Sequence, residues 1–317
     1  MTGTPFVAGD WGTSHLRLYL CGSDGAVLGA ASGPGAAASQ GAFAATLRSL
    51  LEPWIREHGD LPVILCGMVG SSIGWALAPY VACPTRPEAI AAASIGVESA
   101  RVRIVPGLSC RNRLDAPDVM RGEETQILGA LHRHPELARG RHVLCLPGTH
   151  TKWAVLEDGS VREFITAPTG ELFRLLATHS ILVRDVRDDA DPPAEIDAGI
   201  FARGAAKLER FASVSVLHRI FECRARRLSG ELSARDSESF LSGLLIGEDV
   251  RGAAELLLEG GEHDICIIGA PELARLYSLA VTAYGLGAKV LDGGTAAREG
   301  LVFVHQLLAV RQHARAH

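Results

Sequence analysis

The sequence of 317 residues has few aromatic residues, no paired cysteines and no long apolar run. Its seven cysteines are scattered without a C-x-x-C pair, which argues against zinc sites and disulfides and favours free thiols in a reducing compartment. No apolar run approaches the roughly 20 residues of a membrane-spanning helix. The first residues also lack the basic and apolar regions of a signal peptide. We therefore expect a cytoplasmic protein with no membrane partner.

A strong charge of one sign is also missing. Lys and Arg together number 31 and Asp and Glu 36, so the formal net charge is −5 and no nucleic acid is expected as a partner. One basic stretch, residues 203–227, is diluted by Leu, Phe and Glu and predicts a solvated helix face. The length suits two lobes of ordinary domain size.

Two common nucleotide-binding motifs are missing from the sequence. It contains no G-x-x-x-x-G-K-[S/T], and no G-x-G-x-x-G follows the first expected strand. It shows instead a repeated pattern of strand, Gly-Thr turn, strand, turn and strand, which begins near residue 6 and again near residue 143. Two lobes built in this way would place their Gly-Thr turns on facing sides of a cleft, although an α/β protein can also contain two hairpins by chance.

The first Gly-Thr turn has residue types that suit a phosphate group. Gly12 lets backbone N–H groups approach an anion, Thr13 and Ser14 add hydroxyl donors, and Arg17 supplies a cation. Asp10 can hold a hydrated Mg²⁺. An ordinary β-turn favours the same residue types, so the pattern alone is a weak signal.

The second turn offers Gly148, Thr149 and Lys152 directly after an apolar strand. Lys152 could neutralise charge on a transferring phosphoryl group, or it could be a surface residue of a strand. Later in the chain, Gly269 follows an apolar strand and precedes an expected helix at residues 271–283. Small residues at such a position can host adenine, but they also form plain strand-to-helix turns.

A helix is expected over residues 118–131, with Glu124 on the same face as its apolar residues. A carboxylate at the end of an apolar stripe can act as the base that takes a proton from an attacking hydroxyl. Glu123 and Glu124 could equally be first-turn acids that favour the helix dipole.

In this order, these elements resemble the actin-like superfamily of sugar kinases, and longer motifs resemble the 2-dehydro-3-deoxygalactonokinase family in particular. The resemblance runs from about residue 6 to residue 300. The motifs are G-D-W-G-T-S-x-L-R at 9–17, G-M-V-G-S-x-x-G-W at 67–75, P-Y at 79–80, D-V-M-R-G-E-E-T-Q at 118–126, L-P-G-T-H-x-K-W at 146–153 and H-S-I-L at 179–182.

The resemblance implies an α/β, two-lobed actin-like (ribonuclease H-like) fold. Each lobe would be a mixed five-stranded sheet flanked by helices, with the active site in the interlobe cleft. Residues 1–118 would form the N-terminal lobe, completed by a C-terminal helix at 296–317, and residues 119–295 would form the C-terminal lobe.

The implied activity is ATP-dependent phosphorylation of the 6-hydroxyl of 2-dehydro-3-deoxy-D-galactonate, a step of galactonate breakdown. Asp10 would organise Mg²⁺ through water, and Gly269 would lie under adenosine. The phosphates would be held by Gly12, Thr13, Ser14, Arg17, Gly148, Thr149 and Lys152. The sugar acid would be bound by Gly67, Met68, Gly70, Ser71, Trp75 and Arg121.

Several alternatives stay open at this point. Glu124 is the first choice for the catalytic base, Asp118 the second, and Glu123 is a third candidate. The second turn lacks the Asp that the wider superfamily usually has at position 146 or 147, which leaves the metal more dependent on Asp10. Other functions are a kinase of another 2-keto-3-deoxy sugar acid, a phosphohydrolase of the same fold, or a sugar-acid sensor without enzymatic activity. The stereochemistry of the sugar acid and the oligomeric state are not fixed, with a homodimer as one expectation.

Overall fold

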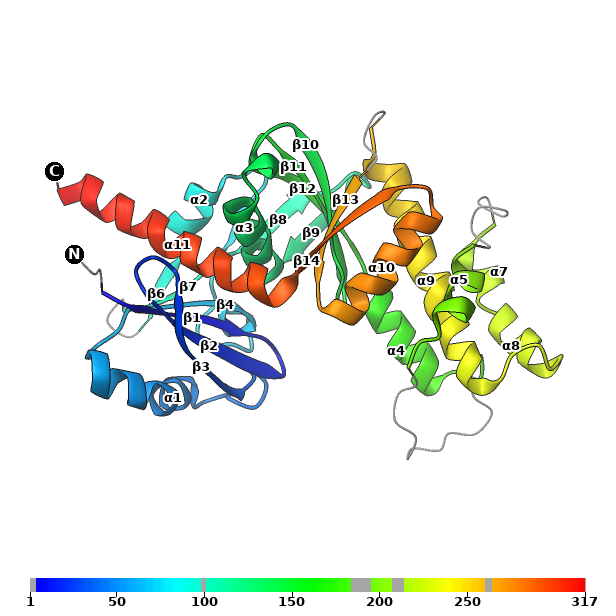
Figure 1. The fold of residues 1–317 in the computed structure, drawn as a ribbon, viewed down its shortest axis with the longest axis horizontal. Helices are drawn as coiled ribbons and strands as arrows, with labels where there is room; N and C mark the ends of the chain where they lie inside the picture. The colour runs from blue at the N-terminus through cyan, green and yellow to red at the C-terminus, as the bar shows by residue number, and fades with distance from the viewer. Residues whose placement is uncertain (1–3, 98–100, 184–194, 207–213, 260–263, 317) are drawn as a thin grey trace. The chain divides into compact units, whose positions relative to one another are not determined.

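The computed structural model describes residues 4–97, 101–183, 195–206, 214–259 and 264–316, in which helices and strands alternate (Figure 1). These residues form two compact units. Unit 1 comprises Met1–Arg141, Leu156–Phe164 and Asp292–His317, and unit 2 comprises His142–Val155 and Ile165–Leu291. Each unit is described by itself below, and the lobe boundaries expected from the sequence stay a prediction.

Unit 1 contains a six-stranded sheet in the order β3-β2-β1-β4-β7-β6. Strand β1 runs antiparallel to β2 and parallel to β4, and the register places Asp10 opposite Arg17 on one side and Cys66 on the other. The sheet has one strand more than expected, because β6 pairs antiparallel with β7 at the edge. Its strands are β1 (Phe6–Trp11), β2 (His15–Cys21), β3 (Val27–Pro34), β4 (Val63–Gly67), β6 (Ile95–Val97) and β7 (Val102–Ile104).

The alternation in β2 has the expected cause: Leu16, Leu18 and Leu20 face the core, while the residues between them are wholly or partly exposed. Helix α1 (Phe43–His58) packs its apolar face onto the same core and ends before Gly59, whose φ of 76° suits a glycine. Strand β4 lies in the middle of the sheet, so all its residues are buried.

Helices α3 (Glu123–Arg133) and α11 (Gly293–Ala316) cross in unit 1 with almost no space between their backbones (Figure 1). A Cβ on Gly129 would lie 1.8 Å from the carbonyl oxygen of Ala296, and a Cβ on Gly300 would lie 1.9 Å from that of Thr125. Only glycine fits at these two positions, so the pair fixes how α11 packs on α3.

The helix expected at 118–131 begins later than predicted. Residues Pro117–Met120 form strand β9, which pairs antiparallel with β8 (Gly107–Arg111), and the chain then turns at Gly122 with a φ of 109°. The sequence analysis missed this small sheet, which has the order β5-β8-β9 and includes β5 (Tyr80–Ala82). Unit 1 also contains helix α2 (Pro87–Ala92) and the 3₁₀ helices η1 (Met68–Gly70) and η2 (Pro135–Ala138).

Unit 2 contains most of a five-stranded sheet in the order β12-β11-β10-β13-β14, with β10 parallel to β13. Residues 160–164 of the edge strand β12 fall in unit 1. The two expected series of three strands are therefore confirmed, as β1-β2-β3 and as β10-β11-β12. The strands are β10 (Arg141–Leu146), β11 (Thr151–Glu157), β12 (Ser160–Ala167), β13 (Asp264–Gly269) and β14 (Gly287–Asp292). The helices are α4 (Thr169–His179), α5 (Ala198–Ala205), α7 (Val216–Arg219), α8 (Glu222–Leu228), α9 (Ala234–Leu257) and α10 (Pro271–Ala283).

All seven cysteines are free thiols, and five of them are buried, as the scattered pattern predicts. Among the residues that the structure describes, none of the helices combines the length and the apolar composition of a membrane span.

Candidate active site

The first Gly-Thr turn joins β1 to β2 and keeps part of its backbone free. The carbonyl groups of Gly12 and Thr13 accept hydrogen bonds from residues 36 and 37, at 2.9 and 3.1 Å. The amide groups of Thr13 and Ser14 donate to none of the described residues, and both side chains are exposed. Free amide groups in a tight, exposed turn are the backbone arrangement that binds an anion.

Asp10 stands near the end of β1, directly before this turn. Its Oδ1 accepts a hydrogen bond from the Cys66 thiol at 3.9 Å, and its Oδ2 lies 3.7 Å from Nη1 of Arg17. Burial raises the pKa of Asp10, while Arg17 and the Cys66 thiol oppose this rise. Such a carboxylate can coordinate a hydrated cation in the ionised form that Arg17 favours.

Glu124 lies in the first turn of α3 and is fully buried, with 0% exposure. Its Oε2 accepts from the Gly122 amide at 2.6 Å, and its Oε1 accepts from the Thr125 hydroxyl at 3.0 Å. Burial raises the pKa of Glu124 to about 8, and the neighbouring charge of Glu123 contributes to the rise. A carboxylate with a pKa near the working pH suits a general base.

The Cys66 thiol lies within the electrostatic influence of both acids. Its pKa is raised well above its ordinary value by burial first, and then by the negative charges of Asp10 and Glu124. The thiol also hydrogen-bonds to Asp10, so β4 places Cys66 close to both carboxylates. The structure thus brings together the residue predicted to hold the metal and the residue predicted as base.

The other two candidate acids have different surroundings. Asp118 lies on strand β9 rather than on a helix, where it accepts hydrogen bonds from the Asn112 side chain at 3.2 Å and from the Val119 amide at 2.8 Å. Glu123 accepts from the backbone amide of Arg121 at 3.1 Å. The choice among the three acids stays a prediction, in which the pKa favours Glu124.

Arg121 reaches the glycine-rich loop that follows β4. Its Nη2 donates to the Ala78 carbonyl at 2.7 Å, and its guanidinium lies 4.5 Å from the centroid of the Tyr80 ring. A Cβ on Gly70 would lie 2.8 Å from Nη1, so the absence of a side chain there makes room for the cation. The buried Nε and Nη1 atoms have no hydrogen-bond acceptor among the described residues. No carboxylate of these residues forms an ion pair with Arg121.

The other residues of this loop mainly stabilise the conformation of the loop itself. Gly67 has a φ of 87° and approaches the Trp11 carbonyl, which a Cβ would meet at 2.9 Å. The Ser71 hydroxyl donates to the Met68 carbonyl at 2.7 Å, and the Trp75 ring stacks on Phe43 at 6.4 Å between centroids. Backbone groups and Arg121 are therefore better placed as ligand contacts than the side chains of Ser71 and Trp75.

In unit 2, the second Gly-Thr turn also has backbone amide groups without an acceptor among the described residues. The amide groups of Gly148 and Thr149 donate to none of the described residues, while the Thr149 carbonyl accepts from the Glu171 amide of α4 at 2.9 Å. Lys152 is not the surface residue of the alternative interpretation, since it is only 6% exposed and donates to the Thr166 hydroxyl at 2.9 Å.

Gly269 lies beside this turn because β13 and β10 are neighbouring strands. A Cβ on Gly269 would lie 3.2 Å from Cδ of Pro147, the residue before Gly148. A cavity of about 90 Å³ is lined by Gly148, Tyr277, Leu276 and Leu273, among others. A second cavity of about 1040 Å³ shares Leu276 with it. The second cavity is lined by Glu195, Ile196, Asp197, Ala198, Arg235, Asp236, Ser239, Glu272, Arg275 and Leu276.

The sequence analysis did not single out these cavity residues. Arg235, Asp236 and Ser239 lie in the first turns of α9, where polar residues are usual and carry no signal of their own. They face Arg275 only through the packing of α9 with α10, which no local pattern reveals.

A metal ion would have few protein ligands here. In the described part of the chain, no group of three or more His, Cys, Asp and Glu side chains could hold one. Mg²⁺ does not need such a group, since it keeps several waters and is commonly held by one or two carboxylates together with substrate phosphates. Asp10, beside a turn with free amide groups, fits this description.

Comparisons with known proteins identify the family of the chain. Residues 10–304 match the family model for 2-keto-3-deoxy-galactonokinase. A protein of Rhizobium meliloti (strain 1021) assigned as a 2-dehydro-3-deoxygalactonokinase is 38% identical over 307 residues, which cover 93% of this chain and 95% of that protein. The 2-dehydro-3-deoxygalactonokinase of Escherichia coli (strain K12) is 34% identical over 298 residues, which cover 93% of this chain and 96% of that protein.

A solved structure extends the similarity to the fold. The crystal structure of a protein from Sinorhizobium meliloti, assigned to the same activity, has a TM-score of 0.86 at 34% identity and covers 96% of this chain and 99% of that one. The expected α/β fold of the actin-like type is confirmed. The chain belongs to the 2-keto-3-deoxy-galactonokinase family, a family of carbohydrate kinases.

Proposed function

We propose that this kinase transfers the γ-phosphoryl group of ATP to the 6-hydroxyl of 2-dehydro-3-deoxy-D-galactonate, a step of galactonate breakdown. The observation that carries the proposal is the placement of Asp10 and Glu124 beside the Cys66 thiol, next to a turn with free amide groups, in a chain of this family.

In the transfer, the bond from O6 to the γ-phosphorus forms while the bond from that phosphorus to the β,γ-bridging oxygen breaks. Glu124 takes the proton of the 6-hydroxyl, and ADP leaves with the electron pair of the broken bond. The amide groups of Thr13 and Ser14 hold phosphate oxygens. Mg²⁺, held through water by Asp10, would neutralise part of the phosphate charge when bound.

The sugar acid carries a carboxylate, for which Arg121 is the proposed partner. Its guanidinium is largely buried without an acid partner among the described residues, and an uncompensated buried cation costs free energy that an anionic ligand would offset. The amide groups of the loop around Gly67 and Gly70 would add donors to the same group.

ATP would be held in unit 2 by the free amide groups of Gly148 and Thr149, with the adenosine in the larger cavity. That cavity has apolar walls from Ile196 and Leu276 and polar groups from α9 and α10, which is the mixture that a nucleoside needs. Gly269 stays a proposed adenosine contact, although it borders the turn and does not line this cavity.

The test is a coupled ADP-release assay with MgATP and a panel of 2-keto-3-deoxy sugar acids, followed by mass spectrometry and phosphorus NMR of the product. The proposal requires turnover with 2-dehydro-3-deoxy-D-galactonate and a 6-phosphate ester as product. ATP turnover that no sugar acid changes would indicate a phosphohydrolase, and faster turnover with another acid of the panel would move the substrate assignment.

Three further expectations stay predictions. They are the use of Mg²⁺, the cytoplasmic location and the homodimer. Activity after removal of divalent ions with EDTA, fractionation of cells and sedimentation of the purified protein would test them in turn.

A further inference from the structure

Asp249 on α9 is an acid that the proposed chemistry does not use. Its Oδ1 accepts a hydrogen bond from Nε1 of Trp153 at 2.7 Å, and its Oδ2 accepts from the Thr169 hydroxyl at 2.7 Å and from the Tyr277 hydroxyl. The Tyr277 hydroxyl also hydrogen-bonds to the Thr151 hydroxyl at 2.7 Å. The three donors and Thr151 are buried, with exposures of 6% or less.

Within the described part of the chain, the donors that hold this carboxylate are all neutral. Among the described residues, no cation forms an ion pair with Asp249. Burial raises its pKa, and the hydrogen bonds from Tyr277, Thr169 and Trp153 oppose the rise. A buried acid that collects three donors fixes the positions of the groups that donate to it.

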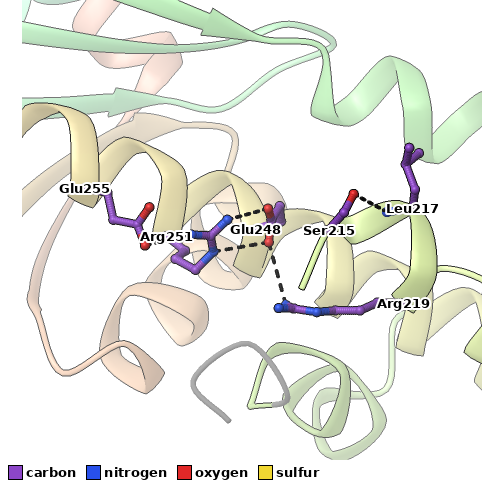
Figure 2. Close-up of polar contacts among 6 residues, drawn as sticks. All are labelled: Ser215, Leu217, Arg219, Glu248, Arg251 and Glu255. Atoms are coloured by element: carbon purple, nitrogen blue, oxygen red, sulfur yellow. Dashed lines mark hydrogen bonds and ion pairs between the residues drawn. The ribbon is translucent and has the colours of Figure 1, made fainter. Parts of the chain in front are cut away.

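The preceding residue shows the opposite arrangement. Glu248 lies 2.6 Å from Nη2 of Arg251 and 3.7 Å from Nη1 of Arg219, and Arg251 continues to Glu255 at 2.6 Å (Figure 2). Arg219 is only 3% exposed, so the solvated helix face expected for residues 203–227 is wrong at this position. Glu248 therefore ties α9 to α7, whose first turn is capped by Ser215 (Figure 2).

The residues of this hydrogen-bond network come from the elements around the second Gly-Thr turn. Thr151 is the first residue of β11, directly after the turn, and Thr169 is the first residue of α4. The start of α4 touches the turn so closely that a Cβ on Gly170 would lie 2.4 Å from the Gly148 carbonyl oxygen. Tyr277 and Thr169 also line the small cavity together with Gly148.

We infer that Asp249 is a positioning residue for the nucleotide: it holds β11, α4 and α10 in the arrangement that leaves the amide groups of Gly148 and Thr149 free for a phosphate. This inference rests on the proposed role of that turn in binding ATP. In this role Asp249 would act through the elements that it holds and not through a contact with the nucleotide.

The experiment compares Asp249→Asn with Glu248→Gln in the full-length protein. Both replace an acid of the same helix by its amide, but only the first turns an acceptor of three hydrogen bonds into a group with one acceptor oxygen and two N–H donors. We expect Asp249→Asn to raise the KM for ATP and the Kd of a non-hydrolysable ATP analogue about tenfold, the size of one lost charge-assisted hydrogen bond. The KM for the sugar acid should change less than about twofold, and Glu248→Gln should keep all three constants near their original values.

Tyr277→Phe provides a second variant if Asp249→Asn does not fold. It keeps the ring and removes the hydroxyl that joins Asp249 to Thr151, and the same selective loss of nucleotide affinity is expected. Unchanged analogue binding in a folded Asp249 or Tyr277 variant would overturn the inference. So would equal rises of both KM values, or an equal loss of analogue binding in Glu248→Gln. Calorimetry of the analogue decides the role of Asp249 even if no sugar acid is phosphorylated, a result that would count against the proposed function alone.

Discussion

The two Gly-Thr turns use the same backbone arrangement in different electrostatic surroundings. The turn at Gly12 follows Asp10 on its own strand, and this acid lies beside Arg17 and the Cys66 thiol. The turn at Gly148 has no acid within it and is supported from α9 by Asp249, which accepts from neutral donors only among the described residues. The first acid is placed to act on a ligand and the second to hold protein groups. In a pair of duplicated hairpins, one acid can therefore take part in the reaction while the other stabilises the protein structure.

The largest expected effect is on the base beside the first turn. Glu124→Gln should lower kcat about 10³-fold, the usual contribution of a general base, and should leave the KM for ATP unchanged. In the unaltered protein, kcat/KM should rise with pH through about 8, because Glu124 accepts a proton only when ionised. A rate assay over pH checks both, and Glu123→Gln is the adjacent control. A large loss in the control with a normal Glu124 variant would assign the base to Glu123.

The same substitution has a predictable effect on stability. Because the pKa of Glu124 is raised to about 8 in the folded protein, the folded state holds a proton that the unfolded state has lost between the ordinary carboxyl pKa and that value. The carboxyl group therefore destabilises the fold increasingly as pH rises through this window. The Tm of Glu124→Gln minus that of the unaltered protein should grow with pH in thermal scans.

The next effect tests whether the acid of the first turn acts on the metal. Asp10→Ala should lower kcat/KM about 10²- to 10³-fold, the size seen when one preorganised electrostatic contact is removed. It should also weaken the dependence of rate on Mg²⁺ concentration. Steady-state rates in a magnesium titration measure this, with Glu52→Gln on the exposed face of α1 as control. Near-normal rates for Asp10→Ala would contradict the metal role of Asp10 and show that the first turn, like the second, works without an acid.

A matched pair of glycine substitutions compares the shapes of the two turns. A Cβ on Gly35 would lie 2.3 Å from the Thr13 carbonyl oxygen, and a Cβ on Gly170 would lie 2.4 Å from that of Gly148. Gly35→Ala and Gly170→Ala should each cost about 1–3 kcal/mol of unfolding free energy through overpacking. Each should also raise the KM for ATP. Gly252→Ala on α9, where a Cβ meets nothing within 4 Å, is the control and should be stable.

The smallest expected effect concerns a hydroxyl of the second turn. The Thr149 hydroxyl accepts from Arg174 at 3.1 Å and is exposed. Thr149→Ala should therefore raise the KM for ATP only about two- to fivefold, as for one exposed neutral contact, because the backbone amide groups remain. A loss as large as that of Asp10→Ala would show that the hydroxyl, and not the backbone, holds the phosphate.

Local patterns were sufficient to predict the turns and most strands, because Gly12 and Gly148 each follow an apolar strand within a few residues. They failed at residues 118–120, which read as the start of a helix but pair with β8, a contact that depends on a strand elsewhere in the chain. Cys66 could not be placed between two acids without the register of β1 with β4. Asp249 could not be connected to the second turn, since its partners lie on three other elements.

The packing of α11 on α3 has a consequence for the order in which the protein is made. Unit 1 contains β1, whose Phe6 ring stacks on the His305 ring of α11 at 3.9 Å between centroids. The ribosome synthesises all of unit 2 between these two residues. A nascent chain that ends near residue 292 therefore has Gly129 and Phe6 uncovered, and we expect its first 141 residues to be digested by a protease that spares them in the finished protein. Proteolysis of ribosome-bound chains of increasing length would show whether resistance appears only after α11 has emerged, which would make the first turn functional only after unit 2 has been synthesised.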